Sequence, residues 1–228
     1  MLLALIAHAA AMTILGARAV PTVRAGAIHM ERDFAPQSLV SELRLELAQR
    51  RDEFQAAESV SSNGCSDDLR QAFRCRPSMG SNAFADLYDR LSVARSELSG
   101  ALGCKLATGL EAAFMVYPAG GYYRRHIDSI AGVDEAGSGR RIVSFICYLT
   151  PSGWTAEDGG ALRVHDNAKA DGDCSYDNAK ADGDCSCGSQ LVLPESGSLA
   201  LFDSKRVWHE VETTRRERAC LVGWMLAA

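Results

Sequence analysis

The chain has 228 residues, of which 47% are hydrophobic and 23% charged, and this balance predicts one globular domain large enough to bury a core. The formal net charge of -5 and the isoelectric point near 5.6 argue against a nucleic-acid-binding surface, because phosphate binding relies on clustered lysine and arginine. A second full domain is not expected.

An apolar run over residues 2–16 precedes Ala17-Arg18-Ala19, a small-residue pattern that resembles a signal cleavage site. Because no positive residue precedes the run, three interpretations stay open: a secretory or organelle-targeting peptide over residues 1–20, a packed N-terminal helix, or a true start at Met30. The first predicts the secretory pathway, the endoplasmic reticulum or an organelle, and the others predict the cytoplasm. The run is shorter than the roughly 20 apolar residues that cross a bilayer, so no stable membrane span is expected.

The eight cysteines do not by themselves establish disulfides. Cys147 and Cys220 lie in apolar, strand-like runs, which predicts buried thiols that pack as small hydrophobic side chains. Cys65 and Cys75 are the pair expected to bond if the protein is exported. The sequence contains no Cys-x-x-Cys, so neither a zinc knuckle nor a thioredoxin motif is predicted.

Two amphipathic helices are predicted in the N-terminal half. Leucines recur among charged residues after Pro36 and predict a helix that continues to about Ala57. A second set of apolar residues at helical spacing predicts a helix from Asn82 to about Leu102. Both helices are expected to pack against the core as buttresses.

From Leu110 onward the apolar pattern changes to a period of two, which predicts short strands separated by turns. In one of these strands, Ser144, Ile146 and Tyr148 are expected to share a face. Helices followed by many short strands predict an α+β, mainly β fold, namely a double-stranded β-helix, or jelly roll, with N-terminal buttressing helices. The strands are expected at 113–117, around 126–128, and at 141–149, 159–164, 198–202 and 218–225.

An internal repeat interrupts this pattern, because residues 166–174 recur at 177–185 with a period of eleven. Its aspartates and glycines resemble calcium loops, but it lacks the spaced ligand pattern that ends in glutamate, and two copies are too few for a solenoid. We expect residues 166–187 to be an inserted hairpin, with a metal-binding role as the alternative. The expected organisation is a single domain over 21–228 with a motif-bearing core at 110–226.

The strongest chemical signal is a set of metal-ligand residues. His126 and Asp128 are two residues apart, so an extended strand would place both side chains on one face. His209 would complete a set of two imidazoles and one carboxylate. That facial set is typical of non-haem Fe(II) oxygenases, whose open positions bind a cosubstrate and dioxygen. Because the ligands must be deprotonated, metal binding is expected to fail at low pH.

Arg218 begins a strand face that continues with Cys220, Val222 and Trp224 and is otherwise apolar. A buried charge without a partner is costly, so a partner is expected. The planar fork of arginine suits the distal carboxylate of a dicarboxylate cosubstrate. Tyr148, which faces inward, would supply a second hydrogen bond.

Together these residues resemble the 2-oxoglutarate- and Fe(II)-dependent dioxygenases, in particular the prolyl 4-hydroxylases and most of all their oxygen-sensing type. The resemblance spans about residues 110 to 226 and rests on the order His126-x-Asp128, His209, Arg218 and Trp224. The supporting motifs are Val116-Tyr117-Pro118, Gly121-Tyr122-Tyr123-Arg124-Arg125-His126, Gly139-Arg140-Arg141, Cys147-Tyr148-Leu149, Gly159-Gly160-Ala161-Leu162-Arg163 and His209-Glu210-Val211.

The resemblance implies roles for particular residues. His126, Asp128 and His209 would bind Fe(II), and Arg218 with Tyr148 would hold the distal carboxylate of 2-oxoglutarate. By the same resemblance, Tyr117 matches a pocket tyrosine, Trp224 matches a pocket wall, and Arg141 matches a position near the peptide substrate. The implied reaction uses O2 and couples the decarboxylation of 2-oxoglutarate to succinate and CO2 with hydroxylation of a proline in a protein or peptide, with ascorbate as reductant.

Two alternatives stay open. The same chemistry could act on lysine, on a small molecule or on another protein residue, because the long loop after Asp128, the repeat and the N-terminal half depart from the family, and loops around a site often select the substrate. The alternative of another class is a jelly-roll binding module with zinc or a structural metal and no turnover. Arg218 discriminates between them, since a pure metal site needs no anchor for a dicarboxylate.

Overall fold

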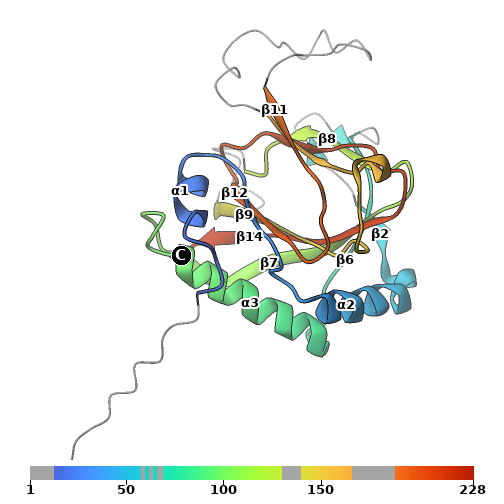
Figure 1. Ribbon diagram of the computed structural model, residues 1–228, viewed down its shortest axis with the longest axis horizontal. Coiled ribbons are helices and arrows are strands. Elements are labelled where there is room, and N and C mark those ends of the chain that lie inside the picture. Colours follow the sequence, from blue (N-terminus) through green and yellow to red (C-terminus); the bar gives the residue numbers. More distant parts are fainter. Residues whose placement is uncertain (1–12, 58–59, 62–63, 66–68, 130–139, 166–187) are drawn as a thin grey trace, which may run out of the picture.

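The computed structural model describes residues 13–57, 60–61, 64–65, 69–129, 140–165 and 188–228 (Figure 1). Two antiparallel sheets dominate it. The larger has the order β1 (His29–Glu31), β12 (Leu199–Asp203), β9 (Arg141–Tyr148), β14 (Arg218–Ala227), β7 (Leu106–Tyr117), β6 (Phe73–Cys75) and β2 (Gln55–Ala56). The smaller has the order β11 (Ser189–Val192), β10 (Leu162–His165), β13 (His209–Val211), β8 (Tyr122–His126) and β5 (Arg70–Gln71). A short hairpin joins β3 (Val60–Ser61) and β4 (Gly64–Cys65).

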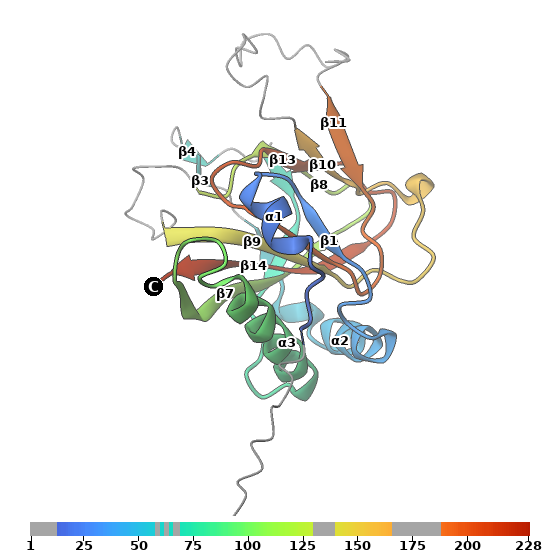
Figure 2. The same cartoon turned by 60° about the vertical axis from the view of Figure 1, so that its left-hand side comes forward.

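Three α-helices precede most of these strands: α1 (Ala19–Arg24), α2 (Gln37–Gln49) and α3 (Asn82–Leu98). In both views α2 and α3 lie side by side on the same side of the molecule, with α3 next to β7, and away from β10 and β11 (Figures 1 and 2). The α+β, mainly β jelly roll with helical buttresses is therefore confirmed, with few helices.

The α3 helix forms because its start is capped and one of its faces is apolar. The Ser81 hydroxyl accepts a hydrogen bond from the Phe84 amide at 3.0 Å, which satisfies one of the free N–H groups of the first turn. The residues that face the core are all buried, namely Ala83, Phe84, Leu87, Leu91, Ala94 and Leu98. The predicted end at Leu102 was too late, because the chain turns at Ser99 and Gly100 takes a positive φ of 79°.

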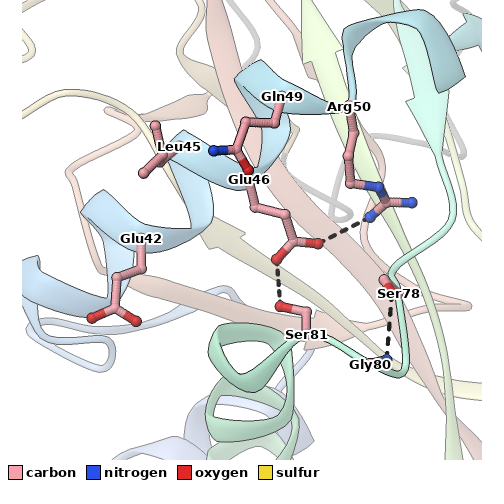
Figure 3. A pocket seen from close by; sticks show the side chains of 8 residues that line it. All are labelled: Glu42, Leu45, Glu46, Gln49, Arg50, Ser78, Gly80 and Ser81. Atoms are coloured by element: carbon pink, nitrogen blue, oxygen red, sulfur yellow. Dashed lines mark hydrogen bonds and ion pairs between the residues drawn. The ribbon is translucent and has the colours of Figure 1, made fainter.

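The first predicted helix also extended too far. The α2 helix ends at Gln49, and a 3₁₀ turn (Arg51–Glu53) and then β2 follow where helix was expected to Ala57. At this corner Arg50 forms ion pairs with Glu46 at 3.0 Å and Glu53 at 2.7 Å, and Ser81 donates a hydrogen bond to Glu46. A surface pocket of about 410 Å³ lies beside these contacts, and Figure 3 shows the side chains that line it. None of the residues predicted for the functional site lines it.

The larger sheet separates two buried clusters. The helices pack on one face, against a cluster that contains Phe145, Cys147 and Leu221. The other face meets the smaller sheet around a cluster that contains Tyr148 and Cys220. The alternation predicted for the strand at 141–149 is confirmed, since Ile146 and Tyr148 lie in the second cluster whereas Phe145 and Cys147 lie in the first. The candidate site occupies the space between the sheets.

Some predicted features lie outside the described residues. The repeat at 166–187 lies wholly outside them, so the inserted hairpin stays a prediction; the strands on either side of it, β10 and β11, pair antiparallel. The start of the apolar run is another, and the targeting segment over residues 1–20 stays a prediction. Within the described chain, no helix has the length and apolarity needed to cross a bilayer. Cys75 is a buried free thiol, and the side chain of Cys65 is outside the described residues.

Candidate metal and cosubstrate site

His126 and His209 lie directly opposite each other where β8 pairs with β13. Their ring centroids are 4.2 Å apart. The next matched pair is Val211 with Tyr123, so three steps along β8 correspond to two along β13 and β8 carries a bulge. Because of this extra residue, Tyr123 returns to the side of His126, and the two rings stack with centroids 3.6 Å apart. The sequence motif contained this tyrosine, but its contact with the histidine was not predicted.

Asp128 joins the two histidines from just beyond the strand. The prediction that it shares a strand with His126 was wrong, because β8 ends at His126 and Asp128 lies in the bend that follows. Its Oδ1 is 3.5 Å from Nε2 of His126, and its Oδ2 is 3.8 Å from Nε2 of His209. One ligand atom from each residue lies within 4.8 Å of the others. The three side chains therefore converge although only two come from strands.

Backbone carbonyls orient both imidazoles. Nδ1 of His126 lies 2.8 Å from the Arg124 carbonyl oxygen, and Nδ1 of His209 lies 3.1 Å from that of Val207. A carbonyl can only accept, so each Nδ1 carries the proton and donates it. In a neutral imidazole held in this way, Nε2 is the nitrogen left free to bind a metal on the side of Asp128, which is the tautomer that a metal-binding histidine requires.

Ser144 orients the carboxylate. Its hydroxyl donates to Oδ2 of Asp128 at 2.6 Å and contacts the Ser204 hydroxyl at 2.8 Å. Burial would raise the pKa of Asp128, but the nearby histidines, His209 above all, and the Ser144 hydrogen bond hold it well below its usual range. The carboxylate is therefore ionised at neutral pH. The strand pattern predicts that Ser144 faces inward, but it does not predict this contact.

His209 is neutral at pH 7 because its buried position disfavours the charged form. Burial lowers its pKa to about 4, and the neighbouring His126 adds to the effect. Phe202 covers the other side of the ring, with centroids 4.7 Å apart. A neutral imidazole beside an ionised carboxylate is the protonation state that binds a divalent metal.

Arg218 is the first residue of β14, in the larger sheet. It is fully buried, with 0% of its surface exposed. Nε donates to the Gly160 carbonyl at 2.9 Å and Nη1 to the Cys220 thiol at 3.4 Å, whereas no described residue accepts a hydrogen bond from Nη2. None of the ion pairs among the described residues includes Arg218. The partner that the sequence led us to expect is therefore not a side chain of the described part of the protein.

Two tyrosines flank this guanidinium. Tyr117 lies opposite Arg218 in the β7–β14 ladder, and Tyr148 lies opposite Cys220 in the β9–β14 ladder. Cζ of Arg218 is 5.0 Å from the Tyr117 ring centroid and 5.2 Å from that of Tyr148. Burial raises the pKa of both phenols, so both remain donors at neutral pH. The Tyr148 hydroxyl is buried and makes no hydrogen bond within the described part of the chain.

Gly160 brings a backbone carbonyl to the arginine. Its φ of 69° lies in the left-handed region, and a Cβ atom there would be 3.0 Å from Cδ of Arg218. Glycine therefore provides both the turn and the close approach. Sequence analysis included Gly160 in a motif and in a strand, but β10 begins only at Leu162.

Trp224 and Arg141 form a separate stack farther along β14 and β9. Cζ of Arg141 lies 3.5 Å from the Trp224 ring centroid. Glu111 on β7 accepts hydrogen bonds from Arg141 at 3.0 Å, and Nη1 of Arg141 reaches the Asp128 carbonyl at 3.3 Å. The Trp224 indole N–H is buried and donates to no group among the residues that the structure describes. The role of Glu111 in this stack was not predicted from sequence.

These residues fit a bound metal ion and a bound dicarboxylate. Two imidazole nitrogens and one carboxylate oxygen are the donor set of non-haem iron sites, and the ligand atoms are close enough to share one ion. The free donors of Arg218 and Tyr148 match the needs of a carboxylate, since an ionised group accepting from arginine would satisfy both. The fold and the site thus define a jelly-roll protein with a facial His/Asp/His cluster and a buried anchor for an anion.

Comparison with known proteins gives the family. Residues 112–226 match the 2OG-Fe(II) oxygenase superfamily, and the chain belongs to it. That family uses Fe(II), 2-oxoglutarate and O2. No curated protein matches the sequence.

Solved structures with the same fold include prolyl hydroxylases. A prolyl-4-hydroxylase from Pseudomonas putida is 26% identical, with a TM-score of 0.73, over 93% of this chain and 98% of that one. A prolyl hydroxylase from Trichoplax adhaerens, solved with a hypoxia inducible factor oxygen degradation domain peptide fragment, is 20% identical, with a TM-score of 0.70, over 92% and 90%. The viral collagen prolyl hydroxylase of Paramecium Bursaria Chlorella virus-1 is 13% identical, with a TM-score of 0.59, over 88% and 96%.

Proposed function

We propose that this protein is a 2-oxoglutarate- and Fe(II)-dependent dioxygenase that hydroxylates a prolyl residue in a peptide or protein. The observation that carries the proposal is the buried, unpaired Arg218 beside the free hydroxyl of Tyr148, between the same sheets as the cluster of His126, Asp128 and His209. A module that only binds a metal has no use for a buried cation of this kind. Burying the cation costs several kcal/mol, and this cost is offset only when an anion binds.

In this proposal the chain's own residues hold both reactants in place. His126, Asp128 and His209 bind Fe(II) through the two Nε2 atoms and a carboxylate oxygen, and Ser144 keeps the carboxylate oriented. Arg218 and Tyr148 bind the distal carboxylate of 2-oxoglutarate. Bound Fe(II) and 2-oxoglutarate would supply the oxidative chemistry, in which 2-oxoglutarate is converted to succinate and CO2 and the substrate receives one oxygen atom of O2.

The remaining residues shape the pocket. Tyr117 forms a wall beside the anchor and, being buried, excludes water from the salt bridge that Arg218 would make. Trp224 would form a wall of the pocket, and Arg141, which stacks on its ring, would lie near the peptide. Ascorbate is the proposed reductant for enzyme left oxidised after unproductive turnover.

Support for a prolyl substrate comes from the structural neighbours. The Pseudomonas putida prolyl-4-hydroxylase matches nearly the whole chain at 26% identity, and the Trichoplax adhaerens prolyl hydroxylase was solved with a peptide. The net charge of -5 favours a peptide over a nucleic acid as the partner.

The test has two stages. Anaerobic addition of Fe(II) and then 2-oxoglutarate should produce a weak visible charge-transfer band in the wild-type protein and no band in His126→Ala. Peptide panels that contain proline or lysine, together with small-molecule candidates, should then be incubated aerobically with and without ascorbate. Proline peptides that gain one oxygen atom by mass spectrometry, with matching succinate, support the proposal.

The alternatives predict other results. Oxygen added only to lysine or to a small molecule would reject the prolyl assignment and keep the oxygenase. A folded wild-type protein that binds metal but not 2-oxoglutarate would favour the non-catalytic metal-binding module.

A further inference from the structure

The Cys220 thiol lies against the guanidinium of Arg218. Its Sγ accepts a hydrogen bond from Nη1 at 3.4 Å, and the residue is 0% exposed. Cys220 shares the inward face of β14 with Arg218 and lies opposite Tyr148 on β9. The thiol is therefore part of the same enclosed group as the two donors without partners, Nη2 of Arg218 and the hydroxyl of Tyr148.

Fixing two nitrogens of a guanidinium fixes the third. The group is planar and rigid, so the Gly160 carbonyl on Nε and the Cys220 sulfur on Nη1 together set the plane in which Nη2 lies. Arg218 has several rotatable bonds, and without these contacts its fork would have to be ordered when the anion binds. Preorganisation of this kind increases affinity by removing that entropic cost from the binding step.

A thiol suits this position because its sulfur can accept a hydrogen bond from Arg218 without neutralising the positive charge of the guanidinium. A carboxylate at the same place would pair with Arg218 and compete with an incoming anion, whereas burial raises the pKa of the Cys220 thiol and keeps it uncharged. The arginine then keeps its full positive charge inside the protein. Among the described residues, no carboxylate forms an ion pair with it.

We propose that Cys220 is a positioning residue for the cosubstrate: its sulfur holds Nη1 of Arg218 so that Nη2 and the Tyr148 hydroxyl point together at the distal carboxylate of 2-oxoglutarate. This inference rests on the proposed function. It assigns to a cysteine, which sequence analysis treated only as a small buried hydrophobic side chain, a role in binding the dicarboxylate.

A second buried cysteine in the neighbouring strand provides a matched control. Cys147 on β9 is also 0% exposed, but it packs in the cluster on the helix-covered face of the larger sheet. Truncating either cysteine to alanine removes the same sulfur atom from a buried position. Only Cys220→Ala removes the acceptor from Arg218.

The experiment measures 2-oxoglutarate binding by isothermal titration calorimetry on full-length protein loaded with Mn(II), which prevents turnover. Loss of a hydrogen bond to a charged group corresponds to roughly a tenfold weaker Kd. We expect that weakening for Cys220→Ala, and little change for Cys147→Ala. Cys220→Ser, which has nearly the volume of the alanine variant but restores an acceptor, should bind within about threefold of wild type.

The serine and alanine variants separate positioning from packing. If both bind 2-oxoglutarate equally weakly, the sulfur acts through volume alone and the inference is wrong. It is equally wrong if Cys220→Ala binds as tightly as the wild type. If the wild-type protein binds Mn(II) but no 2-oxoglutarate, the proposed function itself fails, and that result is distinct from any difference between variants.

Discussion

His126 and His209 are separated by more than eighty residues in the chain but face each other across adjacent strands, with ring centroids 4.2 Å apart. Antiparallel pairing of β8 with β13 brings both Nε2 atoms to Asp128, and backbone carbonyls hold both rings in the same tautomer. The metal site is therefore largely preformed by sheet pairing. Loss of either histidine should abolish it.

The pH dependence of apoprotein stability should reveal the burial of His209. Its pKa is about 4 in the folded protein and 6.5 when unperturbed, so between these values the unfolded chain binds more protons. Above about pH 6.5 the titration of His209 therefore takes little from the free energy of unfolding, and this free energy falls as the pH decreases toward 4. At pH 5 the loss from this group is about 2 kcal/mol.

Urea unfolding of metal-free protein at pH 7.5 and pH 5.0 measures this loss. The wild type should lose about 2 kcal/mol more than His209→Gln, in which the titrating group is absent. Equal losses in the two proteins would show that His209 titrates normally in the fold.

Replacing Arg218 by methionine should abolish cosubstrate binding without destabilising the apoprotein. The substitution removes a buried charge that pairs with no carboxylate of the described residues, so the thermal midpoint of the metal-free protein should stay the same or rise. The Kd for 2-oxoglutarate should increase more than a hundredfold, since about 3 kcal/mol of buried pairing is lost. Calorimetry and thermal unfolding measure the two effects. The control is Arg216→Met, because Arg216 pairs with Asp158 at the surface and should not affect 2-oxoglutarate binding.

Ser144→Ala should weaken metal binding while all three ligands stay in place. The serine donates to Oδ2 of Asp128 at 2.6 Å, and loss of such an orienting contact typically costs about 10- to 100-fold in metal affinity. Competition with a metal-sensitive dye gives the Kd for Mn(II). Ser41→Ala on α2, whose hydroxyl bonds only a helix carbonyl, should leave that Kd unchanged. An unaltered Kd for Ser144→Ala would mean that the bend after β8 holds Asp128 without help.

Gly160→Ala should weaken 2-oxoglutarate binding by about tenfold or more through Arg218. The added methyl group would be 3.0 Å from Cδ of the arginine, in a backbone conformation with φ of 69° that costs about 1 kcal/mol or more for alanine. Gly120→Ala provides the control, because it has a φ of 86° but nothing within 4 Å of the added atom. Gly160→Ala should also lose more stability in thermal unfolding than Gly120→Ala, because its added methyl group lies 3.0 Å from Thr214 as well as from Arg218. If Gly120→Ala weakened 2-oxoglutarate as much, the effect would come from general strain.

Much of this protein follows from local pattern. Strand alternation fixes which side chains share a face, so the inward position of Tyr148 and the common face of Arg218, Cys220 and Trp224 could be predicted without a structure. The order of the histidines, the aspartate and the arginine was enough to indicate the family, because the chemistry constrains these residue types and their spacing.

Other features depend on contacts between distant segments. The ends of both long helices were predicted too late, since tertiary packing and a positive-φ glycine stop them. The bulge that stacks Tyr123 on His126 arises from the pairing of β8 with β13, and the hydrogen bond from Ser144 to Asp128, in the bend after β8, joins the two sheets. No local pattern encodes either contact.

The sequence by itself determined the ligand types, the anchor residue and the alternation that turns them inward, because these depend on side-chain chemistry and on a period of two. Only the tertiary structure decided that Arg218 is buried with a free Nη2 facing no carboxylate of the described chain, and that a glycine carbonyl and the Cys220 sulfur hold it. The physical reason is that burial and hydrogen-bond satisfaction are properties of the whole packed interior, to which β9, β14 and the turn at Gly160 all contribute.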